Sequence, residues 1–455
     1  MWICVPTVVG VLAPLSANSA VLTSLYSFSS LAGGNNTNFD GAATEAELLL
    51  GTNGYLYGTC SAGGSNGLGT VFKVTTSGSL TVLHTFSGAD GQTPWSGLVD
   101  GNDGYYYGTT SGGGVAGGYG TVFKITPSGL FTRLHSFKAT DGAYPGALVK
   151  GNDGSFYGAT QQGSTNNYGN IFRMTSSGEL TPLVAFNLTN GQYGVSRLMQ
   201  ASDGSLYGTT YGGGTNGGFG TIFKLTLSGS FTSVFSFNNT NGAYPYLGPL
   251  AQDSKTNLYG TTWQGGANGG YGTIFRITLS GSLTSLYSFD YYTGEYPIVG
   301  LTIGGDGNCY GVTGGGGTNG GYGTIFQITS AGAFNSLFSF NETNGFGAAS
   351  RLVQASGAGG SFFGTTSMGG TNGTGTIFQI SFPPVLQTRI EAGSTITLNW
   401  STVTGQAYLV QYSTNLTSQI WNNLGGTNTA TNATMTASDI APPDPLRFYR
   451  LLLFP

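Results

Sequence analysis

Residues 206–224 read LYGTTYGGGTNGGFGTIFK and contain two short motifs that recur along most of the 455-residue chain. The first motif is an aromatic residue followed by glycine, and its seven copies are Tyr57-Gly58, Tyr107-Gly108, Tyr157-Gly158, Tyr207-Gly208, Tyr259-Gly260, Tyr310-Gly311 and Phe363-Gly364. The second is Gly-Thr-Ile/Val-Phe or a close variant, which ends at Phe72, Phe123, Phe172, Phe223, Phe275, Phe326 and Phe378. A fixed period near 50 residues in a strand-forming sequence predicts a β-propeller.

A third motif, Leu/Val-x-Ser-Phe or a close variant, adds one strand to each repeat and ends at Phe28, Phe86, Phe137, Phe186, Phe237, Phe289 and Phe340. Its first copy, residues 21–28, precedes every other motif, whereas the last repeat ends near Ile380 without a copy. We therefore predict a seven-bladed β-propeller of four-stranded blades, closed by residues 21–28 in the last blade. Closure removes the unpaired sheet edges that promote aggregation.

The third repeat illustrates the expected blade. Asn-Asp-Gly and Ser-Ser-Gly turns separate apolar runs, as is typical of hairpins. The four expected strands are residues 146–150, 155–160, 169–175 and 180–186. The first and third connections are short, the second is longer and rich in glycine, and the fourth, which leads to the next repeat, is also longer. The long connections share one face of a propeller, where binding sites are more often built.

Composition limits the classes of function. Aromatic residues make up 13% of the chain, too many for a disordered glycine-rich polymer, although 81 residues are glycine. The formal net charge is −4 and the 14 basic residues form no stripe, so no nucleic-acid partner is expected. No apolar run reaches 18 residues, which predicts no integral membrane segment. We expect a monomer.

Three segments follow from these patterns. Residues 1–20 contain an apolar run followed by small residues, which indicates a signal peptide, although no lysine or arginine precedes the run. The alternative is an apolar segment that packs on the protein. Residues 21–382 form the propeller. Residues 383–455 form a small β-sandwich, in which Trp400 and the alternation Tyr408-x-Val410-x-Tyr412 resemble bacterial fibronectin type III-like modules; the alternative is a generic sandwich.

The repeat itself resembles a known family. The unit at residues 206–213, followed by Gly-Thr-Ile-Phe-Lys at 220–224, is similar to the GloVer tandem repeat, and the resemblance covers residues 21–381. It implies an exported bacterial protein, either secreted or on the cell surface.

Polar residues give few candidates for chemistry. Aspartates such as Asp103 and Asp153 recur in equivalent turns, so they are interpreted as turn formers. Equivalent positions also hold His84 and His135, which favours packing over catalysis. Cys60 and Cys309 are expected to be buried thiols, and neither a metal site nor a cofactor is expected. The carboxylates without repeat equivalents give three weak catalytic candidates: Asp290, Glu295 and Glu342.

Aromatic residues in the long connections are the strongest candidates for binding, because such rings supply rigid, amphipathic contact area. The candidate ligand-binding residues are Trp95, Tyr144, Tyr193, Tyr211, Tyr244, Trp263 and Tyr296. The competing interpretation is that these rings fill gaps between blades. We expect a non-catalytic binding module for a glycan or a protein. The alternatives are a polysaccharide-cleaving hydrolase or lyase that uses the three carboxylates, and a structural cell-surface protein.

Overall fold

The computed structural model describes residues 3–6, 20–115, 117–194, 197–355, 361–382, 386–391, 395–401, 407–415, 420–431, 434–440 and 446–454. These residues form strands and turns without a helix, so the predicted all-β class is confirmed. None of them belongs to a helix that is long and apolar enough to cross a membrane. The chain divides into two compact units, one of Thr23–Val353 and Phe363–Gln379, the other of Met1–Leu22, Gln354–Phe362 and Ile380–Pro455.

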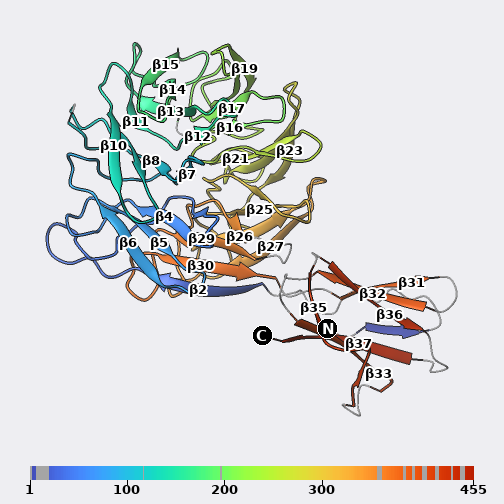
Figure 1. The fold of residues 1–455 in the computed structure, drawn as a ribbon. Helices are drawn as coiled ribbons and strands as arrows, with labels where there is room; N and C mark the ends of the chain where they lie inside the picture. The colour runs from blue at the N-terminus through green and yellow to red at the C-terminus, as the bar shows by residue number, and fades with distance from the viewer. Residues whose placement is uncertain are drawn as a thin grey trace. The chain divides into compact units, whose positions relative to one another are not determined.

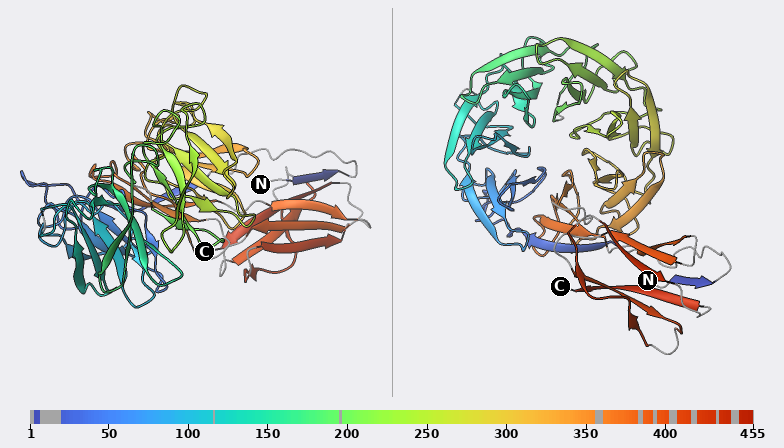
Figure 2. Two further views of the ribbon diagram at one scale, coloured as in Figure 1. Left: turned by 90° about the horizontal axis from the view of Figure 1, so that it is seen from above. Right: turned by 45° about the vertical axis from the view of Figure 1, so that its right-hand side comes forward.

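The repeats form antiparallel sheets of four strands, which Figure 2 shows around a common centre in the manner of a propeller. The first three sheets consist of β3 (Leu49–Leu50), β4 (Leu56–Cys60), β5 (Thr70–Val74) and β6 (Leu80–Thr85); of β7 (Val99–Asp100), β8 (Tyr106–Thr110), β9 (Thr121–Ile125) and β10 (Phe131–Ser136); and of β12 (Val149–Lys150), β13 (Phe156–Gln162), β14 (Asn170–Met174) and β15 (Leu180–Ala185), with β11 (Ala143–Pro145) also on β13.

The remaining sheets repeat this order along the chain (Figure 1). They consist of β16 (Met199–Gln200), β17 (Leu206–Thr210), β18 (Thr221–Leu225) and β19 (Phe231–Ser236); of β20 (Ala251–Gln252), β21 (Leu258–Thr262), β22 (Thr273–Ile277) and β23 (Leu283–Ser288); of β24 (Thr302–Ile303), β25 (Cys309–Val312), β26 (Thr324–Ile328) and β27 (Phe334–Ser339); and of β28 (Val353–Gln354), β29 (Phe362–Thr366) and β30 (Thr376–Ser381) with β2 (Val21–Ser27).

The first strand of each sheet is shorter than the sequence predicts. In the third repeat, β12 has two residues, whereas residues 146–150 were expected to form a strand. The residues just before it are used differently, because Ala143 and Pro145 pair with Gln162 and Thr160 at the end of β13. The chain therefore bends between two short pairings with the same neighbour.

β2 supplies the fourth strand of the last sheet, beside β30. The main-chain N–H of Phe28 donates to the carbonyl of Gly375 at 3.1 Å, as that of Phe86 donates to Gly69 at 3.1 Å within the first sheet. The Phe28 carbonyl also accepts from the Asn372 side-chain amide at 2.9 Å. A segment from the start of the chain thus occupies the same structural position as a strand inside a repeat.

A close cross-strand contact explains the first two sequence motifs. Gly208 on β17 lies opposite Phe223 on β18, and a Cβ atom on Gly208 would lie 2.6 Å from the Phe223 Cζ atom. The corresponding distance is 2.5–2.6 Å in every repeat, for Gly58, Gly108, Gly158, Gly208, Gly260, Gly311 and Gly364. Each phenylalanine ring therefore covers a glycine that no larger residue can replace without movement.

A second aromatic contact joins neighbouring sheets. The phenylalanine that ends each third motif lies edge-on or tilted against the covering phenylalanine of the next sheet, with ring centroids 5.3–5.8 Å apart. The pairs are Phe86–Phe123, Phe137–Phe172, Phe186–Phe223, Phe237–Phe275, Phe289–Phe326, Phe340–Phe378 and Phe28–Phe72. The last pair joins the final sheet to the first.

The second unit contains two antiparallel sheets. They consist of β31 (Leu386–Glu391), β32 (Thr395–Ser401) and β36 (Thr434–Ile440), and of β1 (Ile3–Pro6), β37 (Leu446–Phe454), β33 (Ala407–Ser413), β34 (Asn422–Asn423) and β35 (Asn428–Thr429). Trp400, Tyr408 and Tyr449 form part of its buried core. Of the expected signal segment, Ile3–Pro6 pair with β37, and residues 7–19 lie outside the described residues.

Replacing Gly208 by alanine tests the glycine–phenylalanine contact. The new methyl group would displace Phe223 and Leu198, so we expect Gly208→Ala to lower the free energy of unfolding by about 1–3 kcal/mol. Gly34→Ala is the control, because a Cβ atom there meets nothing within 4 Å, and its effect should stay within about 0.5 kcal/mol. Chemical denaturation measures both, and equal stability of the two variants would contradict the role assigned to the contact.

Candidate functional site

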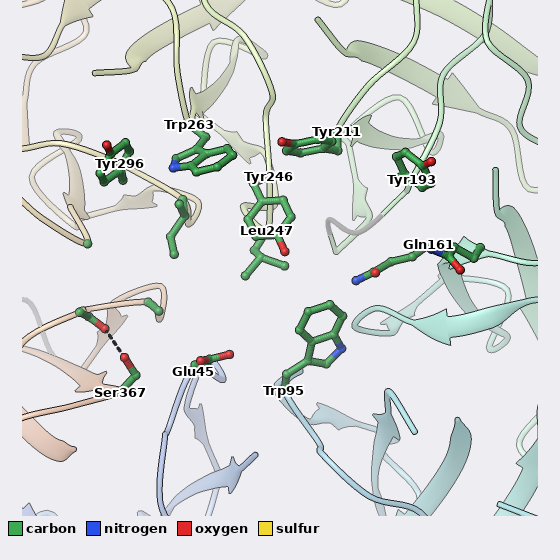
Figure 3. Close-up of a pocket in the computed structure, with 15 residues that line it drawn as sticks. Glu45, Trp95, Gln161, Tyr193, Tyr211, Tyr246, Leu247, Trp263, Tyr296 and Ser367 are labelled. Atoms are coloured by element: carbon green, nitrogen blue, oxygen red, sulfur yellow. Dashed lines mark hydrogen bonds between the residues drawn. The ribbon is translucent and has the colours of Figure 1, made fainter. Parts of the chain in front are cut away.

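One cavity of about 750 Å³ is lined by residues from all seven repeats (Figure 3). Its walls come from the long connections and from the ends of the second strands. The lining residues are Glu45, Trp95, Gln161, Gln162, Tyr193, Tyr211, Tyr246, Leu247, Trp263, Tyr296, Ile298, Gly314, Gly347, Ala349 and Ser367. The volume lies in the range of roughly 300–1,000 Å³ that is common for small-molecule pockets.

Aromatic side chains form a continuous array along one side of this cavity. The Tyr211 ring centroid lies 5.5 Å from that of Tyr246 and 6.2 Å from that of Trp263. Trp263 in turn lies 5.9 Å from Tyr296. Figure 3 shows these rings facing the same open space, with Trp95 on the other side. The array therefore presents several ring faces to one ligand.

A strained backbone position helps to place these side chains. Tyr144, Tyr193, Tyr244 and Tyr296 occupy equivalent positions in four repeats, with φ between 54° and 58°, a left-handed conformation that is uncommon for residues other than glycine. The N–H of Tyr193 donates to the carbonyl of Tyr168, at the end of the preceding connection, at 2.9 Å. Strained positions of this kind often belong to functional sites.

Five of the seven residues predicted to bind a ligand line the cavity: Trp95, Tyr193, Tyr211, Trp263 and Tyr296. Tyr244 does not belong to the lining, because it stacks on Tyr211 with a centroid distance of 5.0 Å. Tyr144 also lies outside the lining, where its N–H donates to the Tyr119 carbonyl. A ligand-binding role for all seven residues stays a prediction.

Several lining residues were not among the predicted binding residues, among them Glu45, Gln161 and Tyr246. A pattern in the sequence could have identified some of the lining positions. Glu45, Trp95, Tyr246, Ile298 and Ala349 all follow the left-handed position by two residues, and their type differs from one repeat to the next. Positions that vary while the surrounding motif stays constant are those at which the fold leaves side-chain identity free.

The three predicted catalytic carboxylates do not line the cavity. The Asp290 carboxylate accepts from the Thr293 N–H and from the Thr293 hydroxyl, both at 2.8 Å, within its own loop. Glu295 pairs through its main chain with Gly315, and burial raises the pKa of its carboxyl. The main-chain carbonyl of Glu342 accepts from Gly370. Among the described residues, no hydrogen bond or ion pair joins the three.

Glu45 is instead the carboxylate of the cavity wall, and burial raises its pKa. An adjoining space of about 50 Å³ is lined by Glu45 together with Glu47, Arg197 and Arg351. Both arginines pair with Glu47, Arg197 at 3.0 Å and Arg351 at 3.6 Å. Burial lowers the pKa of Arg351, and the charge of Glu47 opposes this effect. This cluster joins the first, fourth and seventh repeats.

The repeated acids and histidines serve the fold. The turn aspartates accept hydrogen bonds from the tyrosine of the first motif at 2.7–3.0 Å, in the pairs Tyr107–Asp103, Tyr157–Asp153, Tyr207–Asp203, Tyr259–Asp253 and Tyr310–Asp306. His84 and His135 contact Asp90 and Asp141. Both Cys60 and Cys309 are free and buried, as predicted. Within the described ranges, no group of three or more His, Cys, Asp or Glu side chains could hold a metal ion.

These features define an all-β tandem-repeat protein with propeller-like sheets and an aromatic-lined cavity. The Gloeobacter/Verrucomicrobia repeat matches residues 43–253 and 198–434, so the chain belongs to this repeat family. The resemblance to the GloVer repeat is thereby confirmed. None of the curated proteins matches the chain.

Solved structures with a similar fold include two with different assigned activities. An ulvan lyase of polysaccharide lyase family PL25 shares 10% identity with a TM-score of 0.49, covering 77% of this chain and 94% of its own. A protein from Bacteroides uniformis, provisionally named a 6-phosphogluconolactonase, shares 12% identity with a TM-score of 0.46, covering 70% and 95%. At these levels of similarity neither protein bears on the function of this chain.

The charge cluster beside the cavity can be tested by one matched pair of variants. Glu47→Gln removes the anionic partner of Arg197 and Arg351, so the free energy of unfolding should fall by about 1.5–3 kcal/mol. Glu45→Gln makes the same chemical change two residues away, where the carboxylate has no ion-pair partner among the described residues, and no loss is expected. Equal losses in chemical denaturation would contradict this assignment.

Proposed function

We propose that this chain is an exported, non-catalytic binding protein that holds a carbohydrate in the aromatic cavity. The observation that carries the proposal is the array of half-buried rings, above all Tyr211, Tyr246 and Trp263, around a single space. Aromatic rings offer flat apolar faces that can stack on the apolar face of a sugar ring, and tyrosine hydroxyls and tryptophan N–H groups supply hydrogen bonds at their edges.

A buried amide adds support for a polar ligand. The Gln161 Nε2 atom is buried without a hydrogen-bond partner among the described residues, and Figure 3 shows the Gln161 side chain extending toward the cavity. A buried donor without a partner costs about 1–3 kcal/mol, so a shift of this amide toward a ligand hydroxyl in the cavity would relieve an existing penalty.

We further propose that residues 21–382 close as a seven-bladed β-propeller and that this ring encloses the cavity. The pairing of β2 with β30 and the Phe28–Phe72 contact support closure, because they repeat at the chain end the contacts that join neighbouring sheets. Residues 383–455 are proposed to be a separate fibronectin type III-like sandwich. Export, with residues 1–20 as the signal peptide, stays part of the proposal.

Hydrolysis or elimination of a polysaccharide is the second candidate. Most glycoside hydrolases use two carboxyl groups about 5–9.5 Å apart across the scissile bond. Glu45 lines the cavity, but Glu47 is engaged by two arginines, and Asp290, Glu295 and Glu342 lie outside the lining. This arrangement favours binding over hydrolysis.

A third candidate function is the binding of a partner protein that inserts a loop into the cavity.

Binding to an array of oligosaccharides, followed by calorimetry with the best ligand, tests the proposal. Trp263→Ala should weaken binding by at least about tenfold, because it removes a large stacking face from the centre of the array. Tyr292→Ala is the control, since Tyr292 is 72% exposed and is not part of the lining, and its affinity should be unchanged. Circular dichroism checks that both variants are folded.

Three results would contradict the binding proposal. They are the absence of any sugar ligand, equal affinities of wild type and Trp263→Ala, and turnover of a bound polysaccharide that Glu45→Gln abolishes. The last result would replace binding by catalysis.

A further inference from the structure

Glu45 is an isolated carboxylate in an otherwise uncharged cavity wall. It is the charged residue among those that line the cavity, and no hydrogen bond or ion pair satisfies it among the described residues. The side chain is half-buried, and burial raises the pKa of its carboxyl. A carboxylate that is removed from water without a partner is costly to the protein unless a ligand supplies one.

The nearby arginines do not supply this partner. Arg197 and Arg351 both place their guanidinium groups on Glu47, at 3.0 and 3.6 Å. Arg351 also donates through Nε to the Leu301 carbonyl at 2.9 Å. The opposing charge that acts on Arg351 is that of Glu47. The positive charges beside the cavity are thus already compensated, and the charge of Glu45 is not.

Aromatic rings line the same cavity as this carboxylate. Tyr246 lines the cavity together with Glu45, and the pKa of Tyr246 is raised by burial and further by the charge of Glu45. Figure 3 shows the Glu45 carboxylate directed into the cavity, which Trp95 and Tyr246 also face. A cation near such rings is attracted to their negative faces in addition to the carboxylate.

We infer that the ligand of this cavity is a sugar with a positively charged amine, held between the Glu45 carboxylate and the faces of the surrounding rings. The inference rests on the proposed function, since it specifies the class of carbohydrate. The inferred ligand is an amino sugar whose amine is not acetylated, because acetylation removes the positive charge of the amine. A neutral sugar could donate hydroxyl hydrogen bonds to the Glu45 carboxylate but would bring no opposite charge to it, and an acidic sugar would be repelled by it.

Calorimetry with three oligosaccharides tests the inference: a glucosamine oligomer, its fully N-acetylated counterpart of the same length, and a galacturonic acid oligomer. At about pH 6 the amine carries its charge. We expect wild-type protein to bind the glucosamine oligomer at least about tenfold more tightly than the acetylated one. The acidic oligomer should bind most weakly.

A matched pair of variants assigns this preference to Glu45. In Glu45→Gln the ratio of the two affinities should fall at least about fivefold, and the part of the preference that comes from the ring faces should remain. In Glu179→Gln, which makes the same change in an exposed turn outside the lining, the ratio should stay at its wild-type value.

The possible failures are distinguishable. Equal binding of the amine and acetylated oligomers, or a preference that Glu45→Gln leaves undiminished, overturns the inference and leaves sugar binding intact. Tighter binding of the galacturonic acid oligomer overturns it in favour of the arginine cluster. Absence of binding by all three oligomers, with another sugar of the array bound, overturns the inference alone, whereas the absence of any sugar ligand overturns both the inference and the proposed function.

Discussion

Each repeat depends on one contact, in which a phenylalanine ring on the third strand covers a glycine on the second. At Gly208 the missing side chain lets the Phe223 ring approach to a distance that no Cβ atom would allow. The ring is then available to a phenylalanine from the preceding sheet, Phe186, with centroids 5.8 Å apart. One phenylalanine therefore serves both the pairing of strands within a sheet and the packing between sheets. The motif that contains this phenylalanine recurs in every repeat, whereas most other positions vary.

Because the glycine–phenylalanine contacts hold the sheets together, the sequences of the connections can differ from repeat to repeat. The core motifs fix where each connection begins and ends, and the left-handed position in the connection before each first strand fixes the course of that connection. The residue two positions later is Glu45, Trp95, Tyr246, Ile298 or Ala349 in different repeats, and all five reach the same cavity. A symmetrical scaffold thus carries an asymmetric site, with rings gathered on one part of the wall and one carboxylate on another.

The sequence predicted the scaffold well because its signals are local and repeated. Turn residues, alternating apolar strands and the count of third-motif strands predicted the pairing of residues 21–28 with the last repeat, and the structure has β2 on β30. The site was harder to predict, because it depends on which loop residues point inward. Tyr244 and Tyr246 differ by two positions, yet the first stacks behind Tyr211 and the second lines the cavity. Glu45 was one of several acids without repeat equivalents, and its unpaired state becomes apparent only when Arg197 and Arg351 are placed on Glu47.

Closure of the ring is the claim on which the cavity depends, because a wall with seven contributors requires that the last sheet meet the first. Native-state hydrogen exchange at the Phe28 amide, which donates to Gly375, tests it most directly. A closed ring predicts protection within about tenfold of that at Phe86 and Phe137, whose amides make the equivalent bonds inside the chain. Exchange at Phe28 as fast as in an unstructured terminus, with Phe86 and Phe137 still protected, would contradict it.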